Sequence, residues 1–177
     1  MTLFDTHAHY DDEAFDADRD TVLSAFNGLV IDPGCTLESS RAAVALANRH
    51  PHVYAAVGIH PENCGGFLTE HLDELRRLAR QSKVVAIGEI GLDYYWAENP
   101  PREFQRQVFR AQLELALELD LPVIIHDREA HGDSLAIVKE YPALRGVFHC
   151  YSGSVEMAKE LLDRGWYLGF DGPVTYK

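Results

Sequence analysis

Residues 122–128 read PVIIHDR, a short apolar run that ends in polar side chains. Val123–Ile125 is apolar without interruption, as expected of a β-strand that is buried on both faces. Val53–Val57 is a second run of this kind. Such strands are typical of parallel sheets covered by helices, so these two runs predict an α/β protein.

The same β-rich character recurs along the chain, with helical patterns between the runs. We predict strands at Leu3–His9, Leu29–Pro33, Val53–His60, Val84–Leu92, Pro122–His126, Gly146–Cys150 and Trp166–Phe170. Apolar residues repeat at helical spacing over Leu68–Ala79 and Phe104–Leu115. A succession of βα units indicates parallel strands joined by right-handed crossovers.

Two architectures fit this pattern, an open doubly wound sheet and a closed (β/α)8 barrel, the TIM barrel. A closed barrel usually needs about 250 residues. This chain has 177 residues and seven predicted strands. No linker or change of composition divides it, so we expect a single domain over residues 1–177.

Composition excludes several classes of protein. With 46% apolar and 25% charged residues, the chain can bury a core and is not disordered. No apolar run reaches the roughly 20 residues of a membrane helix, and the first residues do not resemble a secretory signal. The net charge of −12 does not by itself attract nucleic acid. Three cysteines without a CxxC pair fit a reducing cytoplasm.

Metal-capable side chains collect at the predicted carboxyl ends of five strands, the edge where α/β enzymes place their chemistry. These side chains are His7, His9, His60, Glu89, His126 and His149. His7 and His9 are two residues apart, so in a strand both would point to one face. A lone histidine near a strand end is more often an ordinary polar core residue, but the joint pattern is hard to attribute to coincidence.

Glu89 is the most informative of these residues, because its neighbours are apolar or glycine. A buried carboxylate is costly unless it is paired or binds a metal, and a structural salt bridge is the alternative. Nitrogen and oxygen ligands without thiolate suit zinc, manganese, iron or cobalt, and admit magnesium. One carboxylate among histidines suggests a bridge between two divalent ions. We therefore expect metal-assisted hydrolysis of an ester or amide, phosphodiesters included.

Other residues on the same rim are candidates for substrate binding. Arg128 could clamp a phosphate, or form a loop salt bridge. Tyr94–Trp96 could stack on a base, or simply pack a loop. Asp5 and Asp93 could orient metal-bound histidines. We interpret the following residues as surface histidines or small buried fillers: His50, His52, His71, His131, Cys35 and Cys150.

Five segments together resemble the TatD family of metal-dependent deoxyribonucleases, within the amidohydrolase-like barrels. They are FDTHAHYD (4–11), VGIHPENC (57–64), AIGEIGLDYY (86–95), PVIIHDREAHGD (122–133) and FHCYSGS (148–154). The resemblance implies a (β/α)8 TIM barrel with two divalent metal ions at its mouth. It also implies that His7 and His9 bind the first ion and that Glu89 bridges both. His126 and His149 would bind the second, and His60 would serve substrate or catalysis.

The family pattern continues to an eighth strand that supplies a further aspartate ligand, and Asp171 does not match that residue. We therefore expect a C-terminally incomplete TatD-like hydrolase domain with about seven strands. Its first and seventh strands would be unpaired edges. Such a chain should aggregate, dimerise or be stabilised by a missing tail.

The function predicted from these features is hydrolysis of DNA phosphodiester bonds by a 3′–5′ exonuclease of the TatD type, through a two-metal-activated water. Glu89 and His60 are the expected catalytic residues, and Arg128 and Tyr94 the expected substrate contacts. We expect two divalent ions (Mg, Mn or Zn), a single-stranded or 3′-terminal DNA substrate, no membrane and a cytoplasmic location. A D-aminoacyl-tRNA deacylase and an inactive fragment are the alternatives. The sequence leaves the oligomeric state open.

Overall fold

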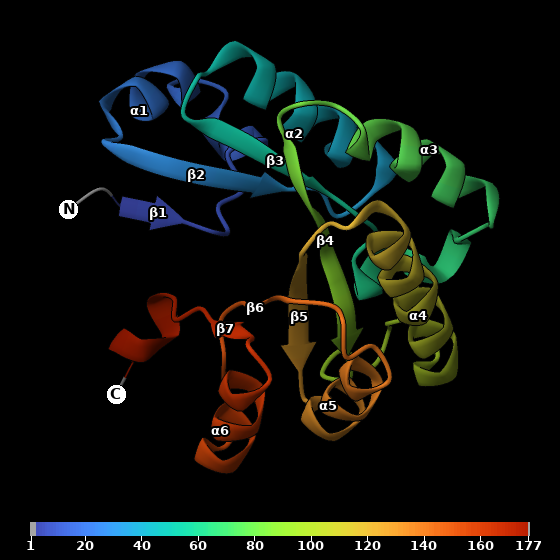
Figure 1. Cartoon of the computed structure of the whole chain (residues 1–177). Helices are drawn as coiled ribbons and strands as arrows, with labels where there is room; N and C mark the ends of the chain where they lie inside the picture. Colours follow the sequence, from blue (N-terminus) through green and yellow to red (C-terminus); the bar gives the residue numbers. More distant parts are fainter. Residues whose placement is uncertain (1–2, 177) are drawn as a thin grey trace.

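The computed structural model describes residues 3–176 and contains a curled, fully parallel sheet of seven strands (Figure 1). The strands follow one another in chain order, and each pairs with the next. They are β1 (Leu3–Asp5), β2 (Gly28–Pro33), β3 (Val53–Val57), β4 (Val84–Asp93), β5 (Val123–Arg128), β6 (Gly146–Phe148) and β7 (Tyr167–Leu168). Sequential parallel order is the arrangement of a barrel rather than of a doubly wound sheet, which confirms the predicted fold class.

Helices connect the strands and lie on the outer side of the curl (Figure 1). They are α1 (Arg19–Ala25), α2 (Leu37–Arg49), α3 (Glu70–Ala79), α4 (Arg102–Leu119), α5 (His131–Lys139) and α6 (Val155–Asp163), with short 3-10 turns η1 (Glu13–Phe15), η2 (Pro61–Gly66) and η3 (Gly172–Thr175). Within residues 3–176, none of them has the length and apolar character needed to cross a membrane.

Two apolar layers explain the continuous apolar strands found in the sequence. Outward-facing residues such as Val30 and Val123 belong to the large core between sheet and helices. Inward-facing residues form a smaller cluster inside the curl: Ile31, Ala56, Ala86, Ile124 and Val147. Each central strand therefore buries both faces, as the uninterrupted runs predict.

Four strands, β1, β3, β6 and β7, end earlier than predicted. The site histidines His7, His9, His60 and His149 therefore follow their strands, whereas His126 lies within β5. β1 ends at Asp5, because the Asp5 carboxylate accepts a hydrogen bond from the backbone N–H of His7 at 3.0 Å and turns the chain. β3 ends at Val57, and His60 instead precedes η2, where Pro61 begins a 3-10 turn. The prediction that strand pleating aligns His7 with His9 was thus wrong.

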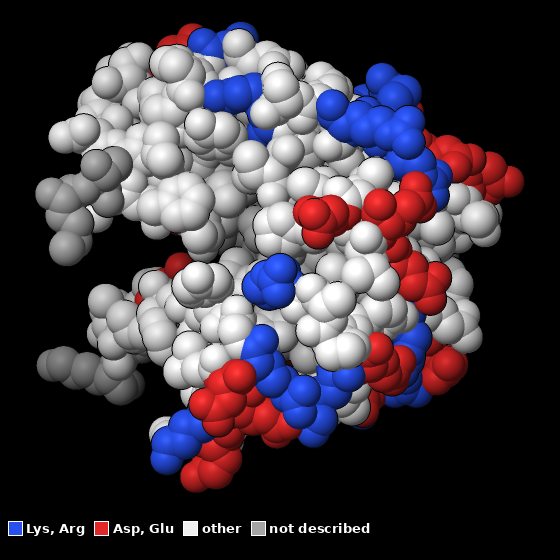
Figure 2. Space-filling view, viewed as in Figure 1, with Lys and Arg blue, Asp and Glu red and all other residues white. Residues whose placement is uncertain are grey.

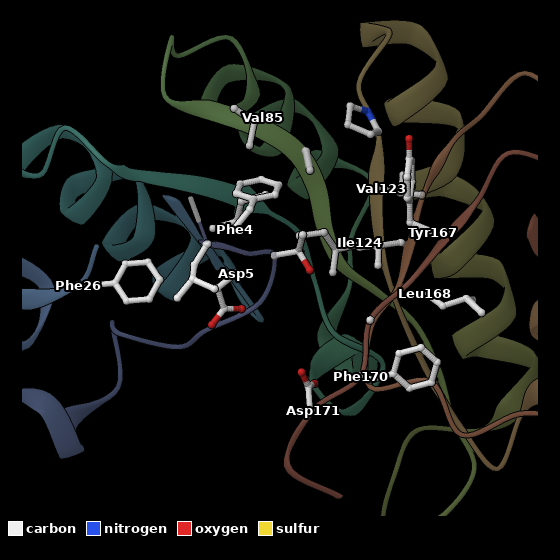
Figure 3. A pocket seen from close by; sticks show the side chains of 18 residues that line it. Phe4, Asp5, Phe26, Val85, Val123, Ile124, Tyr167, Leu168, Phe170 and Asp171 are labelled. Carbon is white, nitrogen blue, oxygen red and sulfur yellow. The ribbon is translucent and has the colours of Figure 1, made fainter. Parts of the chain in front are cut away.

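The outer edges of β1 and β7 are paired with no residue among those described, so the barrel is open between them. A cavity of about 890 Å³ lies in this opening and reaches inner-face residues such as Ile124 (Figure 3). Leu3, Tyr167 and Phe170 line it and are 61, 71 and 64% exposed. Figure 2 shows most charged side chains over the helices, whereas the surface around this opening, at the left of the view, is largely uncharged. The expected unpaired edges are confirmed for residues 3–176.

Candidate metal centre

Glu89 lies in the second half of β4, at the carboxyl end of the sheet, and is 2% exposed. Its two carboxylate oxygens face different groups of histidines. Oε2 faces His7 and His9, whereas Oε1 faces His60, His126 and His149. The structure thus brings together all six residues that the sequence singled out, from five different strand ends.

The first group consists of the two histidines that follow β1. The Nε2 atoms of His7 and His9 lie 3.4 and 3.8 Å from Oε2 of Glu89, and 3.0 Å from each other. The ring of His7 also stacks on the ring of His149, with centroids 3.8 Å apart. The three ligand atoms of His7, His9 and Glu89 lie within 4.8 Å of one another, close enough to share one ion.

The second group surrounds the other oxygen. His126 approaches Oε1 of Glu89 through Nδ1 at 2.9 Å, and His149 contacts the same oxygen through Nε2. The opposite ring nitrogen of His126, Nε2, lies 3.0 Å from Oδ2 of Asp93, the contact expected of an orienting carboxylate. Asp5 makes no such ring contact, because its carboxylate binds the backbone N–H of His7. Asp171 lies 3.6 Å from Nδ1 of His149.

His60 differs from the other histidines in how its ring is held. Its Nδ1 accepts a hydrogen bond from the backbone N–H of Glu62 at 3.2 Å. In the neutral ring the proton therefore sits on Nε2, which lies 3.7 Å from Oε1 of Glu89. A protonated Nε2 donates hydrogen bonds and does not bind a metal. This geometry suits contact with substrate better than metal ligation.

Burial and neighbouring charges give the residues of the cluster different protonation states. Burial lowers the pKa of His7 to about 3 and that of His60 to about 4, so both are neutral at pH 7. Burial opposes charge on His126 as well, but hydrogen bonds to Asp93 and Glu89 outweigh it and raise its pKa to about 9. Hydrogen bonds from His126 and His149 likewise outweigh burial at Glu89, whose pKa is well below its ordinary value.

These residues fit a divalent metal centre. Nδ1 of His7 and Nδ1 of His149 are buried without a hydrogen-bond partner among the described residues. The two oxygens of Glu89 alone cannot serve all the ring nitrogens that converge on them, which come from five histidines. Imidazole nitrogens around an ionised carboxylate are the ligands that zinc, manganese and related ions take.

A long glutamine-bearing helix fixes the strand ends that carry the cluster. Gln105 of α4 binds both the N–H and the C=O of Asp93, each at 2.9 Å. Gln112, nearly two turns further on, binds the N–H and C=O of Ile59 at 2.8 and 3.0 Å. Both amides are buried. Sequence reasoning missed these positioning residues, although a glutamine at an apolar position of a helix is the signal that could have revealed them.

The rim residues are arranged differently from one another. The hydroxyl of Tyr94 donates to Asp133 at 2.7 Å, and the guanidinium of Arg102 covers its ring. The guanidinium of Arg128 instead lies over the rings of Tyr95 and Trp96, at 4.1 and 5.3 Å from their centroids. Tyr95 and Trp96 are 53 and 43% exposed. The accessible aromatic surface of this rim therefore belongs to Tyr95 and Trp96 more than to Tyr94.

Several lesser expectations need correction. Cys35 and Cys150 are only partly buried, and the fully buried cysteine is Cys64. Sγ of Cys35 lies 4.0 Å from Oε2 of Glu89, and burial raises the pKa of this thiol, so it stays neutral. The four histidines interpreted as surface residues are half-buried and lie outside the cluster: His50, His52, His71 and His131.

A barrel-type parallel sheet with a carboxylate surrounded by histidines at its carboxyl edge defines the class of metal-dependent hydrolases. The family described as TatD related DNase matches residues 4–177. The chain therefore belongs to the TatD family, as the motif resemblance predicts.

Individual relatives agree with this assignment. The chain is 39% identical to the uncharacterized metal-dependent hydrolase YabD of Bacillus subtilis, over 99% of this chain and 71% of YabD. It is 37% identical to the 3′-5′ ssDNA/RNA exonuclease TatD of Citrobacter koseri, over 96% of this chain and 67% of that protein. The crystal structure of YjjV, a TatD homologue from Escherichia coli K12, matches with a TM-score of 0.91 and 34% identity, over 98% of this chain and 70% of that structure.

Proposed function

We propose that this protein hydrolyses phosphodiester bonds at the 3′ ends of single-stranded DNA, with two divalent ions held around Glu89. The observation that carries the proposal is the division of the histidines between the two oxygens of Glu89. His7 and His9 would hold one ion, and His126 and His149 the other. When bound, such ions polarise the scissile ester and activate water.

The remaining site residues would position the substrate. His60 would donate a hydrogen bond from Nε2 to a phosphate oxygen, because its Nδ1 already accepts one from the backbone. Arg128 would contact a phosphate at the rim. Tyr95 and Trp96 lie beside it and expose ring faces on which terminal bases would stack. Tyr94 would hold the loop in place through its hydrogen bond to Asp133.

The overall charge supports a preference for strand ends over long duplex. A net charge of −12 repels an extended polyanion, so binding would depend on local contacts at the metal centre and at Arg128. Three free cysteines support a cytoplasmic location, which we include in the proposal.

Comparison of substrates tests this proposal. A 5′-labelled single-stranded oligonucleotide, the same sequence as a blunt duplex, and a D-aminoacyl-tRNA are each incubated with the protein and Mn²⁺ or Mg²⁺. We expect a ladder of shortened 5′-labelled products from the single strand, slower cleavage of the duplex, and an intact aminoacyl ester. Deacylation without a ladder would identify an aminoacyl-tRNA hydrolase instead. No reaction on any substrate would favour the inactive-fragment alternative.

A further inference from the structure

A third group of possible ligands lies beside the metal centre, on the side away from Glu89. It consists of His9, Asp11 and Asp32, whose ligand atoms lie within 4.8 Å of one another. Asp32 is near the carboxyl end of β2, and Asp11 belongs to the turn after β1. Nδ1 of His9 lies 3.8 Å from Oδ1 of Asp11. Neither aspartate belongs to the set of residues assigned to the two ions above.

Asp32 is the unusual member of this group. Its side chain is fully buried, and neither carboxylate oxygen accepts a well-formed hydrogen bond among residues 3–176, although Asp11 lies close enough to interact with it. An unpartnered buried carboxylate is expensive, and native structures rarely keep one without a reason. Burial and the neighbouring Asp11 together raise the pKa of Asp32 to about 9.

The nearby cation does not neutralise this carboxylate. The guanidinium of Arg19 donates to the backbone carbonyls of Tyr10, Asp11 and Asp12. It also pairs with the exposed carboxylate of Asp16 at 2.7 Å. Arg19 thus fixes the turn that carries Asp11. Its charge acts on Asp32 from a distance, lowering the pKa of that carboxyl, but the two form no ion pair.

We propose that Asp11, Asp32 and Nδ1 of His9 form a further binding site for a divalent cation such as Mn²⁺ or Zn²⁺. Two carboxylates and one imidazole are a ligand set that these ions accept. Ligands of one ion lie about 3–4 Å apart, so a small closure of the three side chains brings them to binding distance. The bound cation would supply the partner that Asp32 lacks.

His9 connects this site to the main centre. Its Nε2 faces Glu89 at 3.8 Å, while its Nδ1 faces Asp11. A neutral imidazole has one free nitrogen lone pair, so His9 can serve both positions at once only if its ring gives up its remaining proton and bridges the two ions as an imidazolate. The further site therefore fills after the main centre, as the metal concentration rises.

Metal stoichiometry tests the proposal without reference to activity. Mn²⁺ is titrated into the full chain and the free ion is followed by electron paramagnetic resonance. We expect Asp32→Asn and Asp11→Asn each to bind one ion fewer than the wild type. Asp18→Asn is the matched control, because Asp18 is exposed and lies outside the group. Equal stoichiometry in all four proteins would overturn the proposal.

A second comparison separates this inference from the assignment of the main centre. Glu89→Gln weakens the main centre, and the double variant Glu89→Gln/Asp32→Asn should then bind one ion fewer than Glu89→Gln alone. Urea unfolding with chelator present checks that each variant folds. Asp11 is partly accessible, with 13% of its side chain exposed, so Asp11→Asn serves if Asp32→Asn does not fold.

Discussion

At the scale of single residues, the site depends on side chains whose protonation states are set by one another. Glu89 and Asp93 keep His126 charged, while burial keeps His7 and His60 neutral. A metal ion that binds Nδ1 of His126 must therefore displace a proton, so metal affinity should rise with pH up to about 9.

These shifts also predict how the stability of the chain depends on pH when chelator is present. Below pH 6.5, His7 and His60 bind protons in the unfolded chain but stay neutral in the folded chain. The free energy of unfolding therefore decreases as the pH falls toward 3. The raised pKa of Asp32 has the opposite effect on stability over this range. It is one group against two histidines, so the free energy of unfolding still falls as the pH falls. Above pH 6.5 the folded chain keeps protons on His126 and Asp32 that the unfolded chain releases, so stability is lost as pH rises toward 9.

We therefore expect the free energy of unfolding to be greatest near pH 6.5. Urea unfolding at about pH 5, 6.5 and 8.5 with chelator present measures it. A free energy that increases steadily up to pH 8.5 would show that the His126 pairs do not form as described.

Tryptophan fluorescence tests the stacking surface at the rim. The chain has two tryptophans; Trp96 is 43% exposed and Trp166 is buried. We expect a single-stranded oligonucleotide to quench fluorescence when Ca²⁺ replaces the catalytic ion, and Trp96→Phe to remove the quenching. An abasic oligonucleotide should quench much less, because stacking needs the base. Equal quenching by both oligonucleotides would place the bases elsewhere.

At the level of helices and strands, the sequence predicts where the strands lie better than where they end. Apolar runs locate the central strands, because burial on both faces leaves a continuous signal. The edge strands β1 and β7 are exposed, and only β-rich composition at the expected spacing indicates them. The ends of β1 and β3 depend on local hydrogen bonds of Asp5 and on Pro61, which periodicity does not report. The buried hydrogen bond between Gln105 and Asp93 joins residues on two elements, so the sequence pattern did not predict it either.

β4 and β5 approach each other so closely at Gly91 that a residue with a side chain does not fit there. Its φ of +142° is a conformation that residues with a side chain rarely adopt, and a Cβ would lie 2.0 Å from the carbonyl oxygen of His126. We expect Gly91→Ala to lower the free energy of unfolding by about 3 kcal/mol or more. Gly132→Ala in α5 is the control, since its Cβ meets nothing within 4 Å and should stabilise the helix slightly. Similar effects of both changes would refute this reading of the strand pair.

At the scale of the whole molecule, the opening between β1 and β7 exposes strand edges and apolar side chains together. Exposed edges of this kind promote association between chains. We expect the 177-residue chain to self-associate in a concentration-dependent way in light scattering. Tyr167→Lys should shift it toward the monomer, because Tyr167 is 71% exposed beside the edge. A wild-type chain that is monomeric at every concentration would contradict this expectation.

We propose that Glu89 organises a metal centre that cleaves nucleic acid. The most direct test is the rate of cleavage of a single-stranded oligonucleotide at saturating Mn²⁺ by the wild type, by Glu89→Gln and by the control Glu98→Gln. Glu98 is exposed in the loop after β4. We predict that Glu89→Gln lowers kcat by at least about 100-fold, because a neutral amide cannot replace the bridging charge, and that Glu98→Gln is unchanged. A folded Glu89→Gln protein that cleaves at the wild-type rate would contradict the proposed role of Glu89.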